Sequence, residues 1–208
     1  MLASVARGAA IVSTALVVTA CSAFGGKAAP EPEFTAISKE APFELRSYPE
    51  LVVVKTAMND GTRGGFGRLF DYISGANGGK RKIAMTAPVL ETEKGTEIAM
   101  TAPVLRNQTG AGQEMAFILP KEFTAETAPV PSDPAVRLDV IAPRSVAVIS
   151  FSGVARDDDV AEARQKLEAW IAAKGLTATG PAELAQYNPP WTVPAMRRNE
   201  VLIPIKGL

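Results

Sequence analysis

Two stretches of sequence decide the fold, FELRSYPELVVV at residues 43–54 and VRLDVIAPRSVAVISF at residues 136–151. Each contains alternating apolar and polar residues and a run of β-branched residues, which is typical of half-buried and buried strands. A proline turn divides each stretch, at Pro49–Glu50 in the first and at Ala142–Arg144 in the second. We therefore predict four strands here, at residues 43–48, 51–54, 136–141 and 146–151.

A glycine-containing break and then a helical pattern follow each stretch. In the first helix apolar residues recur at i, i+3, i+4 and i+7, and Ser74–Gly75 end the pattern. In the second, Asp157–Asp159 supply caps and negative charge at the start, and Gly175 is expected just beyond the end. The predicted apolar faces are Phe66, Leu69, Phe70 and Ile73 in the first helix, and Val160, Ala163, Leu167 and Trp170 or Ile171 in the second.

The remaining strand-like segments complete a duplicated plan. They are residues 113–119, 182–187 and 200–205. The order strand–strand–helix–strand therefore occurs twice, which predicts an α+β domain whose two similar halves are related by a pseudo-twofold axis.

The segment IAMTAPVL occurs twice, at residues 83–90 and 98–105. Both copies alternate as strands do, and Lys94–Gly95 between them predicts a turn, so an antiparallel ribbon is expected. Pro88 and Pro103 cannot donate a ladder hydrogen bond. They should therefore lie at an edge, a bulge or a strand end.

The composition excludes several classes of function. The 208 residues include no histidine and one cysteine, and 22 basic residues balance 22 acidic ones. The absence of histidine removes His-based acid–base catalysis and His-ligated zinc or haem, and a single cysteine removes internal disulfides and Cys-cluster metal sites. A net charge of zero argues against nucleic-acid binding.

The N-terminus predicts export and lipid anchoring. The uncharged run Ala9–Ala20 is too short to span a bilayer but suits a signal peptide, residues 1–20, and its end resembles a bacterial lipoprotein box with Cys21 as the lipidated residue. The alternative is an ordinary secretory signal with an incidental thiol. We expect a flexible tether over residues 21–41 and a folded domain over residues 42–208. Ser22, in place of aspartate, favours the outer membrane, with the domain facing the periplasm.

The sequence resembles the SOUL haem-binding protein family from about residue 42 to the C-terminus. YISGAN at 72–77, the two IAMTAPVL segments and YNPPWTVPAMRRNEV at 187–201 carry the resemblance. It implies a distorted antiparallel β-barrel with two long helices and internal duplication, a fold similar to effector-binding domains that bind small hydrophobic molecules. It also implies a groove for haem or another tetrapyrrole, although a histidine ligand cannot be carried over to this chain.

The candidate ligand-binding residues are Tyr72, Met85, Met100, Trp191, Arg197 and Arg198. Methionine and tyrosine can ligate iron or line a groove, and arginine pairs with propionates. Their structural alternatives are core positions for the methionines, a buried hydrogen bond for the tyrosine and an aromatic staple for Trp191. No catalytic or metal-binding set is evident, since an enzyme would depend on carboxylates such as Glu114 or Glu200 acting alone.

The sequence therefore predicts a lipid-anchored envelope protein that is not an enzyme. It would bind a hydrophobic small molecule, with haem or another tetrapyrrole as the candidate, without histidine ligation. The alternative is a structural or interaction lipoprotein whose groove is vestigial, with a protein partner that the sequence does not identify.

Overall fold

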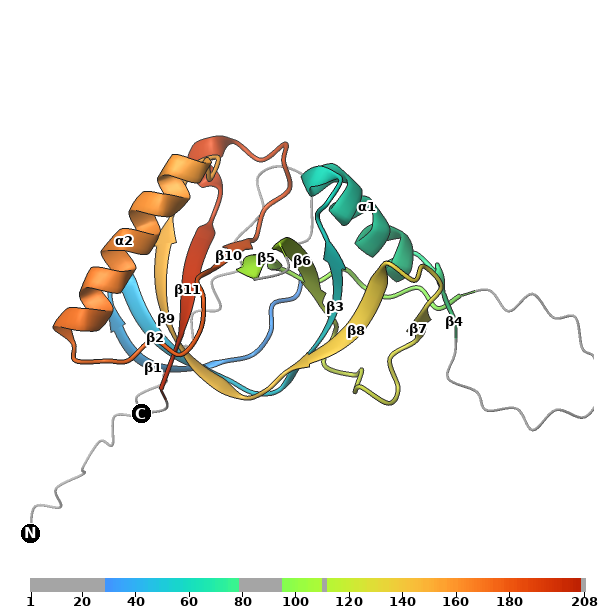
Figure 1. Ribbon diagram of the computed structural model, residues 1–208, viewed down its shortest axis with the longest axis horizontal. Coiled ribbons are helices and arrows are strands. Elements are labelled where there is room, and N and C mark those ends of the chain that lie inside the picture. Colours follow the sequence, from blue (N-terminus) through green and yellow to red (C-terminus); the bar gives the residue numbers. More distant parts are fainter. Residues whose placement is uncertain (1–28, 79–94, 110–111, 207–208) are drawn as a thin grey trace, which may run out of the picture.

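A strongly curled antiparallel sheet carries two helices, α1 (Gly61–Ile73) and α2 (Asp157–Ala173), in the computed structural model (Figure 1). The structure describes residues 29–78, 95–109 and 112–206. Within this part the strand order of the sheet is β1-β2-β9-β11-β10-β5-β6-β3-β8, and β4 pairs with β7 separately. The strands are β1 (Thr35–Glu40), β2 (Phe43–Tyr48), β3 (Leu51–Ala57), β4 (Asn77–Gly78), β5 (Val104–Thr109), β6 (Gly112–Ile118), β7 (Val130–Pro131), β8 (Val136–Ile141), β9 (Arg144–Phe151), β10 (Glu183–Gln186) and β11 (Asn199–Ile205).

The segments 43–57 and 136–151 form one long antiparallel ribbon. Strand β2 pairs with β9 and β3 pairs with β8, and the register continues unchanged from the first pair to the second. This register places Pro49 opposite Pro143. Because neither proline can donate a ladder hydrogen bond, the ribbon is interrupted and bends there. The two predicted turns are therefore bends within two long strands. These two strands are distant in sequence and pair with each other on both sides of the bend.

The predicted duplication is confirmed. The units β3–α1–β5–β6 and β9–α2–β10–β11 have equivalent connections, because β6 pairs with β3 and β5 just as β11 pairs with β9 and β10. Pairing between β5 and β10 joins the two halves at the centre of the sheet. In Figure 1, α2 lies at the upper left and α1 at the upper right, with β10 and β5 between them. The α+β distorted barrel is thus as expected.

Three apolar clusters form the core. One packs under α1 around Leu69 and Phe117, and a second packs under α2 around Leu167 and Val201. The third contains strand residues, such as Val53, and no helix residue. Residues next to one another along a strand point to opposite faces, so this third cluster lies on the face of the sheet turned away from the helices.

The predicted apolar face of the first helix is partly wrong. Its buried residues are Gly65, Leu69, Tyr72 and Ile73. Phe66 and Phe70 are 36% and 47% exposed. They lie about one residue step of rotation away from the buried stripe, so they border it instead of filling it. The second helix buries Ala163, Leu167 and Ile171, as predicted.

One strand prediction is corrected. Residues 98–103 of the second IAMTAPVL segment form no strand, and β5 begins at Val104, just after the cis peptide bond between Ala102 and Pro103. The N–H groups of Ile98 and Ala102 donate hydrogen bonds to the carbonyls of Ile73 and Pro30, outside the sheet. The first copy, residues 83–90, lies outside the described residues, as does most of the expected ribbon.

The folded part of the chain begins earlier than predicted. Strand β1, at Thr35–Glu40, pairs with β2 as an edge strand of the sheet. The tether predicted over residues 21–41 is therefore wrong for residues 35–40, which form an edge strand of the sheet. Residues 21–28 lie outside the described part.

A glycine substitution at the end of α2 tests the predicted helix boundary. Gly175 has φ +67°, a conformation that costs an alanine about 1–2 kcal/mol, so Gly175→Ala should lower the free energy of unfolding by about that amount. Gly67→Ala is the matched control, because Gly67 lies in α1 and a methyl group there would meet no other atom within 4 Å; this change should stabilise the protein by up to ~1 kcal/mol. Urea unfolding of the two variants should give opposite signs; a destabilised Gly67→Ala would contradict the assignment.

Candidate ligand-binding site

A pocket of about 180 Å³ lies where the two halves of the sheet meet. Its apolar lining comes from strands β10 and β11 and from α2, through Leu184, Val201 and Val160. Polar side chains of β5, β6, β10 and α2 complete it, namely Arg106, Asn107, Gln113, Glu183, Asp157 and Arg164, together with Ala182 and Met58. We call this the central pocket. It combines an apolar floor with a few polar groups, as small-molecule sites do.

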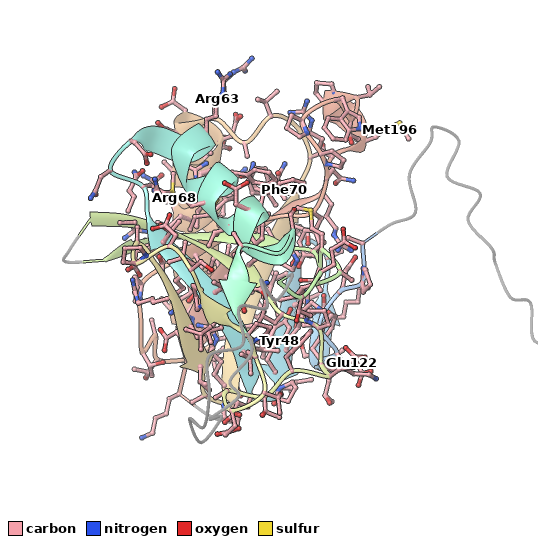
Figure 2. All side chains as sticks on the ribbon, turned by 90° about the vertical axis from the view of Figure 1, so that its right-hand side faces the viewer. Tyr48, Arg63, Arg68, Phe70, Glu122 and Met196 are labelled. Atoms are coloured by element: carbon pink, nitrogen blue, oxygen red, sulfur yellow. The ribbon has the colours of Figure 1, made fainter. Side chains whose placement is uncertain are left out.

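An aromatic wall borders this part of the sheet. The rings of Phe66 and Phe70 on α1 stack with centroids 6.1 Å apart, and Phe66 meets Phe117 of β6 edge-on at 5.2 Å. Figure 2 labels Phe70 on α1. Register pairs share a face of an antiparallel sheet, and Phe117 is opposite Val104, two residues before Arg106. The aromatic pair is therefore on the same face as the central pocket.

Arg106 is a cation of this face that has no ion-pair partner among the described residues. Its register partners are Leu184 on β10 and Met115 on β6, which are both apolar. The side chain is half-buried and makes no ion pair with any residue that the structure describes. Arg164, by contrast, pairs with Glu168 at 2.7 Å. A half-buried guanidinium without a carboxylate partner is well suited to bind the acidic group of a ligand.

A buried polar network lies on the opposite face of the sheet. Its centre is Glu200, which is 1% exposed. Arg46 donates to both oxygens of this carboxylate, at 2.7 and 3.0 Å. Tyr187 donates to it at 2.6 Å and Ser150 at 3.3 Å. Arg46 also donates to Glu44 at 2.8 Å. We call this the Glu200 network, and its acceptors are already in use.

The ionisation of the Glu200 network follows from these contacts. Burial alone would raise the pKa of Glu200, but hydrogen bonds from Arg46 and Tyr187 outweigh it and lower the pKa. Burial and the neighbouring carboxylate raise the pKa of the Tyr187 phenol. The pKa of Tyr48 is also raised, chiefly by burial. The Glu200 carboxylate is therefore held ionised and the phenols of Tyr187 and Tyr48 are held neutral. Because these groups are partners of one another, we assign the network a structural role.

A second pocket, of about 250 Å³, lies on this same far face of the sheet. Its charged side chains satisfy one another. Arg144 donates to both oxygens of Glu183, at 2.7 and 2.6 Å, and Lys55 donates to Asp139 at 2.8 Å. Although it is larger than the central pocket, it offers neither a free charge nor an aromatic wall, and we do not assign the ligand to it.

Three of the sequence-predicted site residues, Tyr72, Arg197 and Arg198, do not line the central pocket. Tyr72 is buried and donates to the Pro129 carbonyl at 2.8 Å, and burial raises its pKa to about 12. Arg197 donates to carbonyls of its own loop, at Thr192 and Pro190. Arg198 pairs with Glu31 at 2.5 Å and lies 3.6 Å over the Tyr187 ring.

Met100 and Trp191 are exposed and also do not line the central pocket. Met85 and Cys21 lie outside the described residues. Sequence reasoning missed Arg106 because strand β5 was placed too early; with β5 at Val104–Thr109, alternation puts Val104 and Arg106 on one face.

The described side chains do not fit axial ligation of haem iron. The chain has no histidine, and Tyr48, Tyr72 and Tyr187 each take part in buried hydrogen bonds. Met58 is the methionine that lines the central pocket, and it is packed into the core under α1. Within the described ranges, no group of three or more Cys, Asp and Glu residues could hold a metal ion.

Comparison with known proteins identifies the family. The family described as SOUL heme-binding protein matches residues 29–204, which is most of the chain. The chain belongs to the SOUL heme-binding protein family. The match begins at residue 29, in agreement with a folded part that includes β1. No curated protein matches this SOUL sequence.

Solved structures share the fold of this SOUL protein at low sequence identity. An uncharacterized conserved protein from Listeria innocua is 12% identical with a TM-score of 0.53, over 81% of this chain and 94% of that one. A hydrolase from the same organism is 14% identical with a TM-score of 0.51, over 82% and 94%. The EcmrR–DNA complex is 11% identical with a TM-score of 0.51, over 80% and 57%. These likenesses show the fold alone.

Removal of the Glu200 charge tests the structural role of its network. Glu200→Gln leaves the buried Arg46 without its carboxylate, so the free energy of unfolding should fall by about 3–5 kcal/mol. Glu168→Gln removes an exposed helix pair and should cost about 0.5 kcal/mol or less. Urea unfolding at pH 7 measures both.

The same comparison has a predicted pH dependence. Because the pKa of Glu200 in the folded protein lies below its ordinary value of 4.5, the stabilisation is fully present above that value and is lost as the pH falls through the folded pKa. The difference between wild type and Glu200→Gln should therefore shrink only in acid below pH 4.5. A constant difference down to strong acid would contradict an ionised Glu200.

Proposed function

We propose that this SOUL protein binds a hydrophobic, carboxylate-bearing small molecule of the tetrapyrrole class at the central pocket and the adjoining aromatic wall. The observation that carries the proposal is Arg106, a half-buried cation without an ion-pair partner among the described residues, placed between apolar strand residues. Family membership supports the ligand class.

The chemistry of the site suits a flat ligand with acidic groups. An arginine fork can donate two parallel hydrogen bonds to one propionate. Phe66 and Phe70 can stack against a conjugated ring. The central pocket is smaller than the roughly 300–1,000 Å³ of sites that enclose drug-sized ligands. The ligand would therefore place one edge in the pocket and its ring against the open wall.

Binding in this proposal does not use iron. The ring and its carboxylates supply every contact, so haemin and iron-free protoporphyrin should bind with similar affinity and one to one. A catalytic function has no comparable support, because Glu114 is paired with Arg137 and Glu200 is held ionised in its network. Neither carboxylate is placed to exchange a proton with a substrate.

A porphyrin titration of Arg106→Gln tests the proposal. Loss of a charge-assisted hydrogen bond of about 1.5 kcal/mol should weaken protoporphyrin binding roughly tenfold, as measured by quenching of porphyrin fluorescence. Arg137→Gln, on the far face of the sheet, is the matched control and should bind as wild type does. Binding of haemin alone would show iron ligation and overturn the iron-independent mechanism.

Absence of binding by either porphyrin would favour the second candidate function. In that case the protein is a structural or interaction lipoprotein with a vestigial groove, and Arg106 has no ligand. Val130 and Val140, which are 46% and 38% exposed, are apolar surface residues available to such a contact. Neither candidate function requires catalysis.

We also propose that Cys21 carries a lipid anchor and that the domain lies in the bacterial envelope, facing the periplasm. The lipoprotein-box resemblance of residues 18–21 supports this, and Ser22 favours the outer membrane. Among the described residues no helix is long and apolar enough to cross a bilayer. Mass spectrometry of the mature protein from membranes should show an N-terminus at Cys21 with acyl mass; an unmodified Cys21 in membrane-free protein would contradict the anchor.

A further inference from the structure

The loop of residues 189–196, which we call the 189–196 loop, presents large apolar side chains to solvent. Trp191, Val193 and Met196 are 82%, 58% and 68% exposed. In Figure 1 this segment runs along the top of the molecule between β10 and β11, and Figure 2 shows Met196 protruding at the end where Arg63 also lies. Three such residues on one short loop are more than scattered surface apolar residues account for.

The loop is held in this arrangement by its own polar contacts. Arg197 donates to the carbonyls of Thr192 and Pro190, so its guanidinium is engaged by the backbone of the loop. The N–H of Arg198 is donated to the Asn188 side chain at 2.7 Å, and the N–H of Gly153 is donated to Pro194 at 3.0 Å. These hydrogen bonds fix the backbone of the loop with its apolar side chains exposed to solvent.

The N-terminal end of the described chain lies against the same region. Glu31 pairs with Arg198 at 2.5 Å, directly after the loop. Glu31 comes ten residues after Cys21, and this length of chain spans at most about 33 Å when extended. A lipid on Cys21 would thus keep Glu31, and with it Arg198 at the end of the loop, within about 33 Å of the bilayer surface.

The chemistry of the surface fits a lipid interface. Tryptophan is enriched where one part of a side chain is in an apolar and another in a polar environment, and burial of apolar loop residues below the headgroups supplies the affinity. The nearby charges are mixed, because Arg63 and Arg156 are balanced by Asp157–Asp159. Apolar contact, and not attraction to anionic lipid, should therefore dominate.

We propose that the 189–196 loop is a membrane-contacting surface that inserts Trp191, Val193 and Met196 into a phospholipid bilayer. The proposal uses the anchoring proposed above but does not depend on ligand binding. It places the end of the domain at which α1 and α2 begin, and hence the upper part of the central pocket, toward the lipid. A hydrophobic ligand would then pass between bilayer and pocket over a short distance.

Vesicle binding by a chain that begins at Ala29 tests the proposal without any lipid anchor. Every buried residue of the three core clusters lies after Ala29, so this chain retains the whole core. On addition of phosphatidylcholine vesicles, tryptophan emission should shift to the blue, and lipids brominated on the acyl chains should quench it. The Trp191→Phe variant should lose this response, because the remaining tryptophan, Trp170, is stacked on Phe43 away from the loop. The variant should still co-sediment with vesicles.

The decisive variant carries Trp191→Ser, Val193→Ser and Met196→Ser together, and it should need at least tenfold more lipid for co-sedimentation. Val130→Ser with Val140→Ser is the matched control, since both valines are exposed on β7 and β8, and should sediment as wild type does. An unchanged Trp191 spectrum, or equal sedimentation of the triple variant and wild type, would overturn the proposal. Protoporphyrin binding by the triple variant should be unaffected, which separates this test from that of the proposed function.

Discussion

Pairing of residues 43–57 with residues 136–151 is the constraint on which the rest of the structure depends. Each long strand ends in a helix, so one continuous register fixes where both helices begin. The β5–β10 pair then closes the sheet between the two units. The central pocket lies at this closure, where residues of both halves meet. The site is thus a consequence of duplication, because neither half contains it alone.

The charged groups on the two faces of the sheet differ in whether they have partners. On the face away from the helices, charged groups of the Glu200 network and the Arg144–Glu183 pair use one another as partners. Such buried pairs contribute little net stability compared with apolar packing, but they are costly to break. On the helix-bearing face, Arg106 has apolar register partners and, among the described residues, no carboxylate partner. A ligand with an acidic group gains most from the face where the cation is not already neutralised.

Periodicity predicted the elements that bury a regular stripe. Strand β8 and helix α2 follow from their alternation and their 3.6-residue pattern, and the duplication follows from their order. Local pattern does not encode which strands pair. The sequence therefore predicted turns at Pro49 and Pro143, although the two prolines lie opposite each other in one ribbon. The same limit hid Arg106, whose role depends on register partners far away in sequence. Arg197 and Arg198 are prominent in sequence, yet local carbonyls and Glu31 occupy them.

The most direct test of the account is a map of amide chemical shifts as iron-free protoporphyrin is added to the chain that begins at Ala29. We expect the largest changes at Phe66–Phe70 on α1, Arg106 on β5 and Leu184 on β10, with little change at Arg46 or Val148 on the far face. Changes centred on Arg46, Glu200 or Arg144 would place the ligand on the far face and contradict the account. An unperturbed spectrum at saturating porphyrin would contradict binding altogether.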